Sequence, residues 1–329
     1  MLEGVVVKAR LPAGFFILLT LLTACSSLHR PPQILPPSLP SSIELTQTPF
    51  FPQVQYQCGP AALATILNYH QLQLQPETLL PQVYLPGRQG SLQIELAATA
   101  RSYGMLAYPL TPDLQSLLHE VAAGNPVLVL QNLSFSWLPK WHYAVVIGYD
   151  LAVDELILRS GTTRRWLTSL TTFGKTWGRA GNWALVILPP HKIPATAQLQ
   201  TYLEAVLDLE QTGSRKDSQS AYLAATKQWP DSPLAWLMLG NNAYALGEAG
   251  TAYNAFTQAA SLDPEDPVIW NNLAYLYLDE SCPAQATHAI EQALRLAPDD
   301  ANLLDSRAEI FAKAAGLRPA DCRLNPRGD

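Results

Sequence analysis

Apolar and polar residues follow a regular spacing in the central part of the chain. After residue 58, apolar side chains recur every three or four positions at Leu63, Ile66 and Leu67, which predicts the buried face of a helix. The stretches 126–130, 141–150, 155–160 and 183–188 are short and rich in β-branched residues, which predicts strands. A helix followed by neighbouring strands predicts an α+β domain, which we place at residues 49–192.

A second pattern, with a period of 34 residues, covers residues 199–316. Trp236 recurs as Trp270, Phe256 recurs as Ile290, and each unit closes on a proline. Small residues where two helices cross, followed by a large apolar residue, resemble tetratricopeptide repeats. The clear units are 234–267 and 268–301; a degenerate unit precedes them, and a capping helix and a tail (317–329) follow.

The resemblance to tetratricopeptide repeats implies an all-α domain that docks a protein or peptide partner. A stack with a purely structural role is the alternative, because a repeat fold alone does not identify a ligand. Asparagines on the first helices of the two clear units are the candidates for contacting a peptide backbone: Asn241, Asn242, Asn271 and Asn272.

The N-terminal residues 1–24 have the pattern of a secretion signal. Two cations, Lys8 and Arg10, precede the apolar run 14–22, which is too short to span a membrane. The run ends in Leu-Thr-Ala-Cys, which resembles a bacterial lipobox and implies a lipid-modified Cys25. An ordinary signal peptide with an incidental cysteine is the alternative. Ser26 after the cysteine implies sorting to the outer membrane, facing the periplasm.

Residues 25–48 are rich in proline, and we expect them to be a linker. Chain of this composition favours the extended polyproline conformation and acts as a semi-rigid spacer. Behind a lipid anchor, such a spacer would hold a domain away from the membrane to which the anchor attaches it.

Composition narrows the classes of function. The formal net charge is −6, with 21 basic and 27 acidic residues, which argues against a nucleic-acid partner. The four cysteines form no Cys-x-x-Cys pair, so no zinc site is expected, and no nucleotide-binding loop is present. We therefore expect no metal or other cofactor.

One cysteine lies where nucleophilic chemistry would need it. Pro60 suits the first turn of the helix after residue 57, so Cys58 should lie at the helix N-terminus. The partial positive charge there should lower the pKa of its thiol, and Gly59 should let a substrate backbone approach. A strand opening at His142 would supply the imidazole that accepts the thiol proton.

The residues Gln53, Gln57-Cys58-Gly59-Pro60, Gly90 and His142 together resemble C39-like cysteine peptidases, over roughly residues 48–190. The resemblance implies a papain-like fold, Cys58 as nucleophile and His142 as general base. It also implies Gln53 as the side-chain donor to the oxyanion. Each residue has a plain structural alternative, namely a buried cysteine, a core histidine and a loop glutamine.

One position departs from the family pattern. The family places an acidic or amide residue on the following strand to orient the imidazole, and the matching position here is Ser160. A hydroxyl carries no charge and would stabilise the imidazolium less. Asp150 is the alternative orienting residue, while His70, on the apolar helix face, is expected to pack rather than to bind a ligand.

Two further features concern the remaining cysteines and the aromatic residues. In an oxidising compartment, Cys282 and Cys322 should form a disulfide that ties the tail to the repeats. The aromatic segment 134–141 before His142 should either line the substrate cleft or pack ordinarily. Together the patterns predict a lipid-anchored cysteine peptidase of the bacterial envelope; a transferase using the same dyad and an inactive binding protein are the alternatives.

Overall fold

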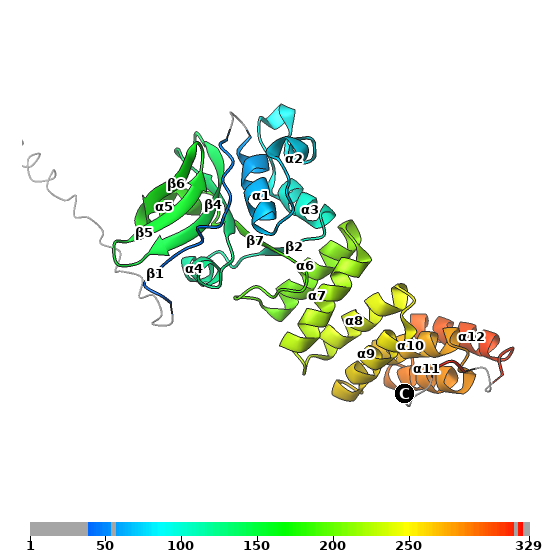
Figure 1. Cartoon of the computed structure of the whole chain (residues 1–329). Helices are drawn as coiled ribbons and strands as arrows, with labels where there is room; N and C mark the ends of the chain where they lie inside the picture. The colour runs from blue at the N-terminus through cyan, green and yellow to red at the C-terminus, as the bar shows by residue number, and fades with distance from the viewer. Residues whose placement is uncertain (1–38, 54–56, 319–321, 325–329) are drawn as a thin grey trace, which may run out of the picture. The chain divides into compact units, whose positions relative to one another are not determined.

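The computed structural model describes residues 39–53, 57–318 and 322–324 (Figure 1). An α+β domain comes first and a run of helices follows it, as predicted. Among the described residues, no helix is long and apolar enough to cross a membrane. Cys25 and the expected signal segment lie outside the described residues.

A seven-stranded antiparallel sheet forms the frame of the first domain. Its order is β2-β7-β3-β4-β5-β6, and β1 pairs with the end of β4 as well. The strands are β1 (Ser42–Glu44), β2 (Leu106–Pro109), β3 (Val127–Asn132), β4 (Trp141–Asp150), β5 (Glu155–Ser160), β6 (Thr163–Ser169) and β7 (Ala184–Leu188). The four predicted strands correspond to β3, β4, β5 and β7.

Strand β1 corrects the expected boundary of the linker. The segment before residue 49 was expected to be a spacer, but Ser42 pairs with Asp150 and Glu44 with Gly148. A side chain at Gly148 would overlap the backbone of Ile43, so the glycine makes this close pairing possible. The sheet domain therefore begins at about residue 42, before the predicted start.

The helices of this domain cover both faces of the sheet. They are α1 (Cys58–Tyr69), α2 (Pro76–Val83), α3 (Gln93–Ser102), α4 (Leu114–Ala122) and α5 (Leu170–Gly178). Leu63, Ile66 and Leu67 of α1 are fully buried in one core with Tyr143 and Val145 of β4. This packing fixes the N-terminus of α1 against the start of β4.

The second part is built from helix pairs with the predicted period. They are α6 (Leu199–Thr212), α7 (Arg215–Gln228), α8 (Pro233–Ala245), α9 (Ala249–Leu262), α10 (Pro267–Asp279), α11 (Pro283–Leu296) and α12 (Ala301–Ala314). A side chain at Gly240 of α8 would overlap the ring of Phe256 in α9. This close crossing is the physical reason for the small residue at that point of the repeat.

The connection between the sheet domain and the helices is buried and hydrogen bonded. Leu106 and Tyr108 of β2 share an apolar cluster with Tyr202 of α6. The fully buried Glu120 accepts hydrogen bonds from the backbone and the hydroxyl of Thr196, both at 2.7 Å. The first helix pair therefore packs directly on the sheet domain.

Candidate active site

Cys58 is the first residue of α1, as the sequence predicted. The backbone carbonyl of Gln57 accepts the N–H of Ala61 and so starts the helix, while Pro60 occupies the first turn. Residues from Gly59 to Leu67 are buried, so the apolar face of α1 holds the thiol at a defined place beside β4. Cys58 itself is partly exposed and is the one free cysteine among the described residues.

Gly59 has a different role from the one expected. A side chain here would overlap the hydroxyl of Ser91 and would come within 2.6 Å of the Ser91 Cβ. The space beside the glycine is therefore filled by the protein and is not open to a substrate backbone. Ser91 was not singled out from the sequence, and its buried hydroxyl has no hydrogen-bond partner among the described residues.

The environment of the thiol reverses the expected shift of its pKa. Burial raises the pKa of Cys58, although hydrogen bonds from the backbone amides of Tyr143, Gly59 and Cys58 itself act in the opposite direction. The helix N-terminus does supply amides to the sulfur, but removal from water outweighs them. At neutral pH the resting group is a thiol.

His142 is the second residue of β4, and its partner is the residue predicted for it. The Nε2 atom of His142 lies 2.8 Å from the hydroxyl oxygen of Ser160, at the end of β5. Burial, with a smaller effect of the Lys140 cation, lowers the pKa of His142 to about 4. The imidazole is therefore neutral at pH 7, and the resting pair is a neutral thiol with a neutral imidazole.

The hydrogen bond to Ser160 leaves the other ring nitrogen available. When Nε2 donates to the hydroxyl, Nδ1 carries the lone pair and can accept a proton. No hydrogen bond joins Cys58 to His142 among the described residues, but the sulfur contacts the amide of Tyr143, which directly follows His142. Asp150 lies at the other end of β4 and accepts the N–H of Ala152, so it does not orient the imidazole.

Gln53 joins the same cluster through both its backbone and its side chain. Its N–H donates to the carbonyl of Gly161 at 3.0 Å, next to Ser160. Its side-chain Nε2 donates to the carbonyl of Tyr143 at 3.2 Å. Because an amide nitrogen has two N–H groups, one remains for a substrate oxygen. The structure thus brings Gln53, Cys58, His142 and Ser160 together around Tyr143.

Tyr143 is the residue that sequence reasoning missed. Its amide contacts the sulfur, its carbonyl holds Gln53, and its hydroxyl donates to the carbonyl of Ser91 at 3.2 Å. The first two contacts use backbone atoms, which every residue carries, so no residue type at this position could signal them. The sequence offered one indication of this role, namely that Tyr143 directly follows the predicted base His142.

The structure shows the surroundings of His70 and of the aromatic segment 134–141. Nε2 of His70 lies 2.8 Å from the carbonyl of Ile187, and burial lowers the pKa of His70 to about 4, in keeping with a packing role. Phe135 and Trp137 are 64% and 79% exposed, so this segment does not pack ordinarily.

Hydrogen bonds define the surroundings of three of the four candidate asparagines of the repeats. Asn242 is buried and donates to Glu210, Ser218 and the carbonyl of Arg215, so it does not contact a partner. Its expected role is therefore wrong, because it joins two repeats internally. Asn272 donates to Asn241 at 2.8 Å on neighbouring first helices, and both stay partly or fully exposed.

The two cysteines of the repeat region are bonded to each other. Cys282 and Cys322 form a disulfide with their Cα atoms 4.4 Å apart. Arg323, next in the chain, donates its N–H to the carbonyl of Glu280 at the end of α10. The tail is thus held against the turn between α10 and α11.

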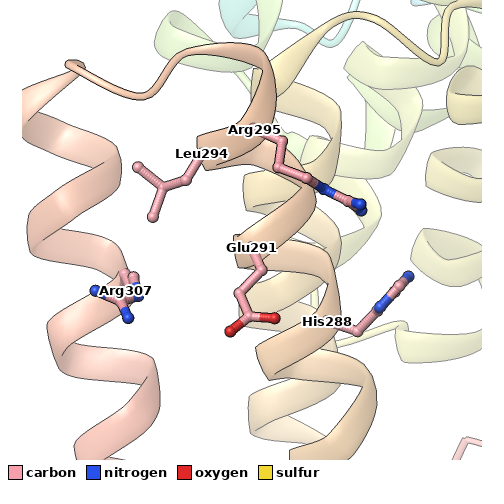
Figure 2. Close-up of a pocket in the computed structure, with 5 residues that line it drawn as sticks. All are labelled: His288, Glu291, Leu294, Arg295 and Arg307. Atoms are coloured by element: carbon pink, nitrogen blue, oxygen red, sulfur yellow. The ribbon is translucent and has the colours of Figure 1, made fainter.

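Other candidate sites in the described residues are weak. No group of His, Cys, Asp and Glu there could hold a metal ion. A shallow, open hollow lies between α11 and α12 and is lined by His288, Glu291, Leu294, Arg295 and Arg307 (Figure 2). It contains none of the predicted site residues.

Comparison with known proteins agrees with the two-part architecture. Residues 45–185 match the model of the peptidase C39 like family, and residues 267–300 match a tetratricopeptide repeat. No curated protein matches the chain.

Solved structures similar to the chain fall into the same two groups. A C39-like peptidase from Bacillus anthracis is 16% identical, with a TM-score of 0.38, over 45% of this chain and 98% of that one. A double glycine motif protease from an AMS/PCAT transporter, solved with a leader peptide, is 18% identical, with a TM-score of 0.33, over 43% and 91%.

The repeats have their own structural neighbour. The tetratricopeptide domain of P58(IPK) is 20% identical, with a TM-score of 0.34, over 36% of this chain; the match spans only 33% of that protein. The family models thus make residues 45–185 similar to the C39-like peptidase family and residues 267–300 similar to a tetratricopeptide repeat.

Proposed function

We propose that this protein is a cysteine peptidase that cleaves a peptide or protein substrate with Cys58 and His142. The observation that carries the proposal is the cluster around Tyr143. It holds the thiol against a backbone amide, the imidazole against Ser160, and the side chain of Gln53 against the carbonyl of Tyr143. These are the three parts that acyl transfer needs: a nucleophile, a base and an oxyanion donor.

The neutral resting pair indicates how the reaction would begin. As the sulfur attacks the scissile carbonyl carbon, the thiol proton passes to Nδ1 of His142, so thiolate and imidazolium form only during attack. The carbonyl oxygen becomes an oxyanion that the Cys58 amide and the free N–H of Gln53 can hold. Collapse breaks the C–N bond, and His142 returns its proton to the leaving amine.

Hydrolysis of the acyl enzyme completes the cycle. A water molecule gives a proton to His142 and attacks the thioester carbon, and the C–S bond breaks to restore the thiol. An amine that attacks in place of water would make the same dyad a peptidyl or acyl transferase. Because the chemistry of the first step is shared, only the products distinguish the two activities.

A second candidate is a peptidase-like binding protein with little or no activity. The observations that favour it are the uncharged partner of His142, the raised pKa of Cys58 and the lowered pKa of His142, which keep the resting pair neutral. The hydroxyl of Ser160 can orient the ring, but it adds no negative charge to stabilise an imidazolium. This candidate predicts binding without turnover.

We further propose that the protein is a lipoprotein of the bacterial envelope, anchored through Cys25 and facing the periplasm. The lipobox-like sequence around Cys25 supports the anchor, and the disulfide between Cys282 and Cys322 suits an oxidising compartment. The repeats would dock a protein partner. Peptides with a Gly-Gly-like cleavage site are the first substrates to test.

The test uses a peptidyl electrophile ending in Gly-Gly, with the modified residue found by mass spectrometry. Cys58 is expected to be labelled at least a hundredfold more slowly in His142→Ala, because no base then accepts the thiol proton. His70→Gln is the matched control and should label at the normal rate. If Cys58 labels no faster than a simple thiol and His142→Ala changes nothing, the peptidase proposal fails.

A further inference from the structure

The loop between β3 and β4 carries exposed apolar side chains and leads directly into the strand that holds His142. Phe135 and Trp137 are 64% and 79% exposed, and Leu138 and Trp141 are 59% and 54% exposed. The rings of Phe135 and Trp137 stack with their centroids 5.7 Å apart. A patch of this composition is costly to leave in water, and on a soluble surface it marks a site of interaction.

The loop is held rigidly at its base. The side-chain oxygen of Asn132 accepts the N–H groups of Ser134 and Lys140, both at 3.0 Å, and its nitrogen donates to the carbonyl of Phe135. The guanidinium of Arg179 donates twice to the backbone carbonyl of Asn132. The aromatic side chains are therefore presented outward by a braced turn.

The segments around the end of the sheet where β4 begins carry only positively charged side chains. Residues 131–149 and 156–183 contain six lysines and arginines and no aspartate or glutamate, although the whole chain has a net charge of −6. Arg159 is buried and Arg165 pairs with Glu44 of β1, which leaves four cations for this surface. Lys140 and Arg164 lie at the starts of β4 and β6, and Arg179 contacts β3. Lys175 adjoins Thr176, which accepts a hydrogen bond from Gln131 of β3.

We infer that this edge of the sheet binds an anionic lipid surface. We name it the aromatic edge, comprising Phe135, Trp137, Leu138, Trp141, Lys140, Arg164, Lys175 and Arg179. Tryptophan side chains favour the boundary between water and acyl chains, and nearby cations attract lipid phosphates. A negatively charged protein with one basic, aromatic edge would meet such a surface in a single orientation.

A lipid surface fits the aromatic edge better than a peptide does. The four apolar side chains are more than half exposed on an outward turn, whereas a peptide-binding site usually encloses the side chains of its ligand. Because His142 directly follows Trp141, the proposed dyad would then lie close to the lipid surface. Lipid binding itself needs neither Cys58 nor turnover, so it goes beyond the proposed function.

The experiment measures binding to lipid vesicles by sedimentation. Residues 39–329, which form one compact unit, are used so that no acyl chain or N-terminal apolar segment contributes. Vesicles of phosphatidylcholine alone are compared with vesicles that also contain about a third of phosphatidylglycerol. The variants are Phe135→Ala/Trp137→Ala and Lys140→Gln/Lys175→Gln, with Lys216→Gln/Lys227→Gln on α7 as the charge-matched control.

The inference predicts tighter binding to the anionic vesicles. The aromatic double variant should weaken binding at least tenfold on them. The lysine double variant should weaken it about fivefold for each cation removed, and the α7 control should change it less than twofold. Cys58→Ala should bind normally, which separates this test from the proposed catalysis.

Three outcomes would overturn the inference. The first is equal binding of the chain to neutral and anionic vesicles, and the second is equal binding by the aromatic double variant and the parent chain. The third is no binding to either kind of vesicle; a loss of kcat/KM on a soluble peptide in Phe135→Ala/Trp137→Ala would then assign the aromatic edge to the peptide substrate. A thermal melt of each variant verifies that the fold is retained.

Discussion

Replacing Ser160 with aspartate tests whether a negative charge beside His142 can offset the burial that keeps the imidazole neutral. The hydroxyl oxygen lies 2.8 Å from Nε2 of His142, so a carboxylate there would lie within hydrogen-bond distance of the ring. A carboxylate this close favours the imidazolium and raises a histidine pKa by about one to three units. The pKa of His142 should therefore move from about 4 to between about 5 and 7.

The assay follows the histidine ring signals by NMR as the pH is changed, with His142→Gln to assign the signal. Ser160→Asn is the matched control, because an amide has nearly the same shape as the carboxylate but no charge. Since each unit of pKa corresponds to about 1.4 kcal/mol, kcat/KM at pH 7 should also rise about tenfold in Ser160→Asp. The reasoning is wrong if Ser160→Asp and Ser160→Asn titrate alike.

Three further predictions concern stability and the packing behind the nucleophile. Burial lowers the pKa of His70 to about 4, so the unfolded chain binds more protons below pH 6.5 and stability falls as pH drops to 4. His70→Gln should narrow the gap in Tm between pH 7 and pH 4.5, and an unchanged gap would contradict this. Cys282→Ser/Cys322→Ser opens a loop spanning 40 residues and should cost about 3–4 kcal/mol in urea unfolding, unlike Cys58→Ala. Gly59→Ala should lower kcat/KM at least tenfold because it displaces Ser91, and adding Ser91→Gly should restore most of it; no rescue would refute the overlap.

The helices and strands that could be predicted are those that local runs of residues define. The helix after residue 57 and strands β4 and β5 follow from runs of apolar and β-branched residues. Strand β6 was missed because it is an exposed edge strand containing Arg164, Arg165 and Trp166, without a buried run. Strand β1 was missed because three residues inside a proline-rich segment give no periodic signal, and only pairing with β4 defines them.

For the candidate site too, local motifs could be found from the sequence, whereas properties that depend on tertiary packing could not. Motif and order selected Gln53, Cys58, His142 and Ser160, which lie together. The direction of the pKa shift of Cys58 could not be predicted, because the burial that raises this pKa depends on tertiary packing. Asn242 was misassigned for a similar reason, since its partner Glu210 lies 32 residues away in the chain.

The most direct test of the central claim is whether a peptide becomes covalently attached to Cys58 during cleavage. Intact-mass and fragment mass spectrometry, on protein mixed rapidly with a Gly-Gly peptide and quenched in acid, would detect the thioester. The account predicts an acyl adduct on Cys58, release of both peptide halves, and neither in Cys58→Ala. Cleavage that persists in Cys58→Ala would contradict the account.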